Sequence, residues 1–116
     1  MYNKKIFGGG DEEFGGCLAV NGDEIAELRS ELGNQFAEKS NGMRLRGVGA
    51  VVYRVPELED ETKLKISLRS VAEEDTTAVS QRFRGGSHKN ASSFLLSSME
   101  FEQWKVKRNS SSVTVN

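Results

Sequence analysis

Val48–Tyr53, with the sequence VGAVVY, is the stretch that decides the fold. It is a continuous apolar run, and its valines and tyrosine are residue types that favour β-strands. A short run of this kind, with no polar residue at alternate positions, predicts a strand that is covered on both faces. The sequence therefore predicts a sheet with other elements packed against both sides of this strand.

The residues that follow predict two more strands and a short helix. Segment 64–69 places leucine or isoleucine at every second position, the pattern of a half-buried strand, so the polar side chains ending at Arg69 should share one face. Pro56 and the acidic residues behind it predict a loop, because proline does not fit inside a central strand. Residues 75–83 then predict a short helix, and Ser93–Leu96 a further strand.

The residues that precede Val48 predict a strand and a helix. Phe14–Val20 is a short apolar run, and Asn21 and Glu24 have the spacing of a capping box at the start of a helix. Apolar residues recur at helical spacing up to Phe36, so one face of this helix should be buried. Asn41–Gly42 should end it.

The segment Met99–Val106 fits either a helix or a strand, and we favour the helix, because Ser97 and Glu100 would form its capping box. The elements in order are strand, helix, strand, strand, short helix, strand and helix. This order predicts an α+β domain with a mixed β-sheet of four to five strands and helices packed on it. The expected core residues are Leu28, Leu32, Phe36, Val51, Ile66, Leu68, Val79, Phe83 and Phe94.

Composition limits the domain organisation and the chemistry. We expect residues 1–13 to be a flexible lead-in, 14–106 a single domain and 107–116 a disordered tail. The formal net charge of -1 excludes a generally basic surface, so nucleic acid could be bound only by a local patch. One histidine and one cysteine cannot make the usual Cys/His zinc site, and we expect no metal and no cofactor. No run is long and apolar enough to span a membrane and no signal peptide is recognisable, which favours a soluble intracellular protein.

The stretch Phe83–Phe94, FRGGSHKNASSF, is the candidate site. Its adjacent glycines, Gly85 and Gly86, let the backbone turn tightly and approach a ligand closely. Consecutive N–H groups in such a turn can bind an anion. His88 and Lys89 would add donors at the rim, which suits a phosphate or a carboxylate. The alternative is a loop that connects two strands and contains an incidental histidine.

Three segments in this order, Val48–Tyr53, Lys65–Ser70 and Phe83–Phe94, resemble the motifs of the DHHA1 domain. This domain is the C-terminal substrate-binding half of DHH-type phosphoesterases, which include RecJ-like exonucleases and nano-RNA phosphatases. The resemblance covers residues 43–106. It implies a loop that holds the phosphate and sugar of a nucleotide, with an arginine that helps to hold the substrate. The implied substrate-binding residues are Arg69, Ser70, Gly85, Gly86, Ser87, His88, Lys89 and Asn90.

The chain departs from the family pattern at the same stretch. Arg84 and Ser87 stand where the family usually has glycine, and Ser93 where glycine is common. A side chain at Ser87 restricts a backbone that glycine could take to positive φ. The family's metals sit in a separate DHH domain, on aspartates and histidines that this chain lacks, so we expect no enzymatic activity from the chain alone.

The expected function is a non-catalytic module that binds a nucleotide or a short single-stranded RNA or DNA, with no membrane partner. Tyr53 or Phe94 would offer the stacking face for a base. The alternative is a structural or protein-interaction domain that kept the DHHA1 fold and lost ligand binding. Such a domain would act as a homodimer or with a separate protein partner.

Overall fold

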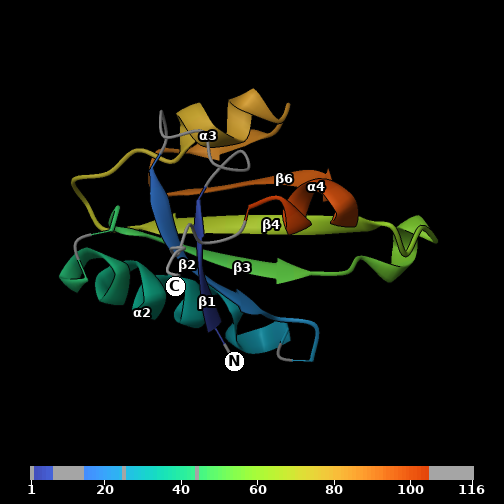
Figure 1. Ribbon diagram of the computed structural model, residues 1–116, viewed down its shortest axis with the longest axis horizontal. Coiled ribbons are helices and arrows are strands. Elements are labelled where there is room, and N and C mark those ends of the chain that lie inside the picture. The colour runs from blue at the N-terminus through green and yellow to red at the C-terminus, as the bar shows by residue number, and fades with distance from the viewer. Residues whose placement is uncertain (1, 7–14, 25, 44, 105–116) are drawn as a thin grey trace, which may run out of the picture.

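The computed structural model describes residues 2–6, 15–24, 26–43 and 45–104 (Figure 1). The described residues form a six-stranded mixed sheet in the order β1-β2-β3-β4-β6-β5. The strands are β1 (Tyr2–Ile6), β2 (Gly16–Asn21), β3 (Val48–Tyr53), β4 (Lys63–Ser70), β5 (Gly86–His88) and β6 (Ala91–Ser97). The helices are α2 (Arg29–Gly42), α3 (Thr77–Arg82) and α4 (Ser98–Glu102), with 3-10 turns at Ala26–Leu28 and Pro56–Leu58.

The predicted α+β class with a mixed sheet is confirmed. Strands β2 and β3 are parallel and are connected through α2, and every other neighbouring pair is antiparallel. The sheet has one strand more than the upper limit expected from the sequence. None of the helices in the described part of the chain is long and apolar enough to cross a membrane.

Two short strands were not expected from the sequence. Residues 2–6 were expected in a flexible lead-in but form β1, with Tyr2 opposite Val20 of β2. This pairing satisfies backbone groups at the edge of β2, which side-chain periodicity does not report. The glycine stretch supplies the other, β5, which pairs antiparallel with β6. The remainder of the expected lead-in, residue 1 and residues 7–13, and the expected tail, 107–116, lie outside the described residues.

The two faces of the sheet are covered by different helices. Helix α2 packs against β2, β3 and β4, whereas α3 and α4 contact β6 (Figure 1). Alternation along β3 places Val51 on the side of α2, here called the α2 face, together with its register partner Ser67 of β4. The opposite side, here called the core face, carries the main hydrophobic cluster. Its buried residues are Cys17, Ala19, Val48, Ala50, Val52, Ile66, Leu68, Val79, Phe94, Leu96 and Trp104.

Helix α2 turns small residues, not large ones, toward the sheet. Its buried residues are Gly33, Ala37 and Ser40. A Cβ on Gly49 of β3 would overlap the carbonyl oxygen of Gly33 and lie 2.7 Å from the backbone nitrogen of Ala37, so helix and strand are in backbone contact. The expected core residue Leu28 is 45% exposed and lies in the 3-10 turn before α2, so that prediction is wrong.

The other expected core residues divide into two groups. Val51, Ile66, Leu68, Val79 and Phe94 are buried, as predicted, whereas Leu32, Phe36 and Phe83 are only partly buried. Burial raises the pKa of the Cys17 thiol to about 12, so this cysteine is a protonated core residue at neutral pH.

The two predicted capping boxes have opposite outcomes. Asn21 accepts a hydrogen bond from the backbone N–H of Asp23, which forms a turn at the end of β2, and α2 begins only at Arg29. Ser97 accepts a hydrogen bond from the backbone N–H of Glu100, so the helix predicted near the C-terminus has the expected cap.

Candidate functional site

The glycine stretch connects α3 to the β5–β6 hairpin, and its residues 83–88 are here called the passage. Gly85 donates its backbone N–H to the carbonyl oxygen of Ser80, 2.8 Å away, which closes the end of α3. A Cβ on Gly85 would overlap the carbonyl oxygen of Ser93 and lie 2.6 Å from the Cβ of Phe94. Gly85 is therefore needed for close packing. Gly86 differs, because nothing lies within 4 Å of the position that its Cβ would take.

Two residues in this passage have backbones that suit glycine. Arg84 has φ 67° and Ser87 has φ 142°, and both side chains are exposed. The left-handed region costs an L-residue about 1–2 kcal/mol, and the region of Ser87 is occupied almost only by glycine. These are two of the positions at which the DHHA1 pattern usually has glycine. The expectation that the Ser87 side chain meets a positive-φ backbone agrees with this geometry.

Ser87→Gly is expected to raise the free energy of unfolding by about 1 kcal/mol, because it relieves the backbone strain of an exposed serine whose side chain makes no hydrogen bond among the described residues. Urea denaturation monitored by circular dichroism measures the change. Ser98→Gly is the matched control: it removes the same side chain from the first turn of α4 and should destabilise by about 0.5–1 kcal/mol. Destabilisation by Ser87→Gly would contradict the strained geometry.

A chain of buried hydroxyls lies beneath the passage. Thr76 and Ser80 are fully buried and Ser92 is 5% exposed. The Oγ of Ser92 lies 2.6 Å from Oγ1 of Thr76 and 2.5 Å from Oγ of Ser80. Thr76 also donates its backbone N–H to the carbonyl oxygen of Lys89 and its hydroxyl to that of His88. This network attaches α3 to both strands of the hairpin and helps to hold the strained backbone.

Sequence reasoning missed the hydroxyl network, although a signal for it was present. Thr76 and Ser80 are one helical turn apart, and Ser92 alternates with the core residues Phe94 and Leu96. Polar residues at positions that periodicity assigns to the interior must find partners, and here they find one another.

Asn90 and Ser70, both expected to bind substrate, bond to each other. The amide of Asn90 donates to the Ser70 hydroxyl at 2.8 Å, to the Val71 carbonyl oxygen at 3.0 Å and to the Glu74 carbonyl oxygen at 2.8 Å. These bonds fasten the hairpin turn to the end of β4. The structure therefore gives Asn90 a positioning role, and its contact with a ligand stays a prediction.

An ion pair supports the same region from the start of β3. The Arg46 guanidinium donates to Oε1 of Glu74 at 2.7 Å, and the backbone N–H of Gly47 donates to Oε2 at 3.1 Å. The Arg46 hydrogen bonds are the main cause that lowers the pKa of the Glu74 carboxyl below its ordinary value of 4.5, with partial burial opposing them. The fold therefore binds the ionised form of Glu74.

Glu74→Gln is expected to destabilise the protein by about 1–2 kcal/mol near neutral pH, since it removes a charge-assisted contact that is about three-quarters buried. Because the folded-state pKa is lowered, this stabilisation is present above pH 4.5 and lost as the pH falls below it. Denaturation of both proteins at about pH 7 and about pH 3.5 should show the difference shrinking in acid. An equal difference at both pH values would contradict this role of the carboxylate.

Arg69 and His88 stand in one row across the sheet. Arg69 of β4 is opposite Ala91 of β6, and Ala91 is opposite His88 of β5, so all three lie on the α2 face. At ordinary strand spacing their backbones are about 10 Å apart, with only the Ala91 methyl between them. The Arg69 side chain extends toward α2, however, where its guanidinium donates to the Ser30 hydroxyl at 2.7 Å.

The other expected ligand residues and stacking faces vary in their availability. Lys89 is exposed at the hairpin turn, and Ser87 points toward the opposite side of β5. Phe94 cannot stack on a ligand: it is 4% exposed and packs against Phe83 on the core face. Tyr53 lies on the α2 face, but Arg29 covers its ring at 3.7 Å. Sequence reasoning did not foresee this Arg29 contact.

The chain matches no protein-family model and no curated protein. The functional argument therefore rests on the contacts described above. Within the described ranges, no three histidine, cysteine, aspartate or glutamate side chains gather in a way that could hold a metal ion.

Proposed function

We propose that this protein is a non-catalytic module that binds a nucleotide, or the end of a short single-stranded RNA or DNA, at the β5–β6 hairpin. The resemblance of three ordered segments to the DHHA1 domain supports the proposal. The ligand would lie on the α2 face over Gly86, with its phosphate between Arg69 and His88. No enzymatic step is assigned to the chain.

One observation carries the proposal: the row of Arg69, Ala91 and His88 beside the open position at Gly86. Neither Arg69 nor His88 has a carboxylate partner among the described residues, and both lie on the same face. A guanidinium group and an imidazole with a small methyl between them suit an anion that enters from solvent. The space above Gly86 lets a ligand approach the backbone directly.

The arrangement also limits the ligand. With a formal net charge of -1, the chain has no general attraction for a long phosphate backbone. A mononucleotide or a short oligonucleotide end fits better, because few phosphates need to be neutralised. Arg69 would exchange its hydrogen bond to neutral Ser30 for a charge-assisted bond to phosphate, an exchange that favours the ligand.

Arg69→Ala and His88→Ala are each expected to weaken nucleotide binding by about tenfold to a hundredfold, the loss of one charge-assisted hydrogen bond. Calorimetric titration with a nucleoside 5′-monophosphate and a trinucleotide RNA at low salt measures the affinity. Lys63→Ala is the matched control, because it removes an exposed positive charge about 20 Å away at the other end of β4.

The result for the control decides how a loss is interpreted. Equal losses in Lys63→Ala and in the two site variants would indicate diffuse electrostatic attraction and overturn the proposed site. Binding through phosphate should also weaken as salt is raised.

A structural or protein-interaction role is the second candidate function. Leu95 favours it, since this leucine is 47% exposed on the same face, opposite Lys65 of β4. Arg84 and Ser87 also favour it, because both have positive φ and carry side chains where the nucleotide-binding loop of the DHHA1 domain usually has glycine. No nucleotide binding at low salt, together with a dimer in analytical ultracentrifugation that Leu95→Lys dissociates, would establish this function in place of the first.

A further inference from the structure

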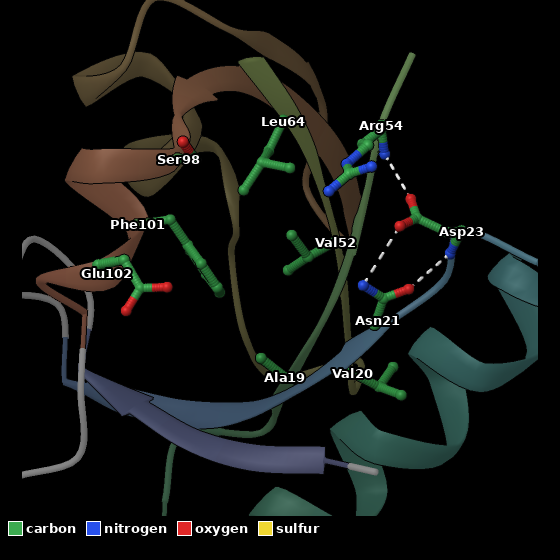
Figure 2. A pocket seen from close by; sticks show the side chains of 10 residues that line it. All are labelled: Ala19, Val20, Asn21, Asp23, Val52, Arg54, Leu64, Ser98, Phe101 and Glu102. Carbon is green, nitrogen blue, oxygen red and sulfur yellow. Dashed lines mark hydrogen bonds between the residues drawn. The ribbon is translucent and has the colours of Figure 1, made fainter. Parts of the chain in front are cut away.

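A pocket of about 440 Å³ lies on the core face, away from the row of Arg69 and His88. It opens between α4 and the carboxyl ends of the parallel strands β2 and β3 (Figure 2). Its volume is in the range of small-molecule sites, and the carboxyl end of adjacent parallel strands is a frequent position for such sites. Its apolar lining residues are Ala19, Val20, Val52, Leu64 and Phe101.

The rim of the pocket carries charges of both signs. Figure 2 shows Arg54 on one side and Glu102 on the other, with Val52, Leu64 and Phe101 between them. Both charged side chains are exposed, and neither makes a hydrogen bond or an ion pair through its charged group with another described residue. One guanidinium and one carboxylate are therefore available to a ligand from opposite sides of an apolar middle.

The second carboxylate of the rim is already engaged. Asp23 accepts the backbone N–H of Arg54 at 2.7 Å and the side-chain amide of Asn21 at 3.4 Å. These bonds connect the turn after β2 to the end of β3 and hold that wall of the pocket in place. The acidic rim also opposes a nucleic-acid ligand, because Asp23 and Glu102 together outnumber Arg54.

We propose that this pocket binds a small zwitterion with an apolar body, of the chemical class of a dipeptide with aliphatic side chains. The ligand's carboxylate pairs with Arg54, its ammonium group pairs with Glu102, and its side chains cover Val52, Leu64 and Phe101. Guanidinium suits a carboxylate by charge and by its forked geometry. This site is independent of the proposed nucleotide site.

Three probes that differ only in their end groups test the proposal on the full chain. The probes are leucyl-leucine, its N-acetylated form and its C-terminal amide, titrated by ¹H–¹⁵N chemical shifts. We expect the two blocked probes to bind about threefold to tenfold more weakly than leucyl-leucine, between the effects of an exposed ion pair and of a charge-assisted hydrogen bond. Equal affinity for all three probes, or no saturable binding of leucyl-leucine, overturns the proposal.

Variants then assign each end of the ligand. Arg54→Gln should weaken the binding of leucyl-leucine by the same factor as C-terminal amidation weakens binding to the unmodified protein. The Arg54→Gln variant should then bind leucyl-leucine and its amide with equal affinity. Likewise, Glu102→Gln should weaken binding as much as N-acetylation does, and this variant should bind the acetylated and free peptides equally. Arg82→Gln and Glu31→Gln change the same groups at exposed helix positions outside the pocket and should bind like the unmodified protein. If the loss of affinity in each variant does not depend on which end of the peptide is blocked, the assignment of its two ends to Arg54 and Glu102 is overturned. Neither result affects the nucleotide titration.

Discussion

Trp104→Ala is expected to lower the free energy of unfolding by about 3–5 kcal/mol, the range for an aromatic residue deleted from a core. Trp104 is 2% exposed, just after α4. Its ring centroid lies 5.4 Å from that of Phe83, 5.8 Å from Phe94 and 5.6 Å from Phe101. These three rings come from a loop, a strand and a helix, so removing their common neighbour leaves a cavity that no single element can close. Urea denaturation measures the loss.

Met99→Ala is the control for this prediction. Met99 belongs to the same short helix, α4, but is 79% exposed, so its truncation should change stability by less than about 0.5 kcal/mol. A loss below about 1 kcal/mol for Trp104→Ala would mean that the aromatic cluster does not hold α4 against the sheet.

The central strands were predictable because their pattern is local. The apolar run of β3 and the alternation in β4 assigned both strands and placed Ile66 and Leu68 in the core. Trp104 was not among the expected core residues. Its burial depends on three rings that are distant in sequence, and the segment Met99–Val106 fitted two kinds of element.

Helix α2 shows a different limit of periodicity. Its apolar residues recur at helical spacing, but the residues that touch the sheet are Gly33, Ala37 and Ser40. A helix that approaches a strand closely enough for backbone contact, as at Gly49, has room only for small residues on its inner line. The larger residues then flank this line and stay half exposed, which explains why Leu32 and Phe36 are not fully buried.

The candidate site was predictable in its position and less so in its contacts. The alternation in β4 placed Arg69 away from the core, and the structure shows it on the α2 face. That His88 shares this face depends on the register of β5, a strand the sequence did not indicate. Asn90 was expected to bind substrate because of the resemblance to the DHHA1 domain, yet its amide is bonded within the fold. Sequence shows which groups are present but not which of them are already engaged.

The two adjacent glycines of the site are expected to respond in opposite ways to alanine. Gly85→Ala should destabilise the protein by about 3 kcal/mol, at the upper end of the range for overpacking. The new methyl group would meet the carbonyl oxygen of Ser93 and the backbone and Cβ of Phe94. Neither can give way easily, because Ser93 is paired with Ser67 within the sheet and Phe94 is fixed in the core cluster.

Gly86→Ala should leave stability unchanged or raise it by up to about 1 kcal/mol, because alanine lowers the entropy of the unfolded chain. The methyl group at Gly86 would meet nothing within 4 Å, and the backbone there does not have positive φ. The same methyl would occupy the space through which a nucleotide is proposed to approach, so its affinity should fall although the fold is intact. Thermal denaturation and nucleotide titration of both variants separate the two roles. Equal destabilisation by the two substitutions would contradict the packing at Gly85, and unchanged affinity in Gly86→Ala would move the proposed ligand away from this backbone.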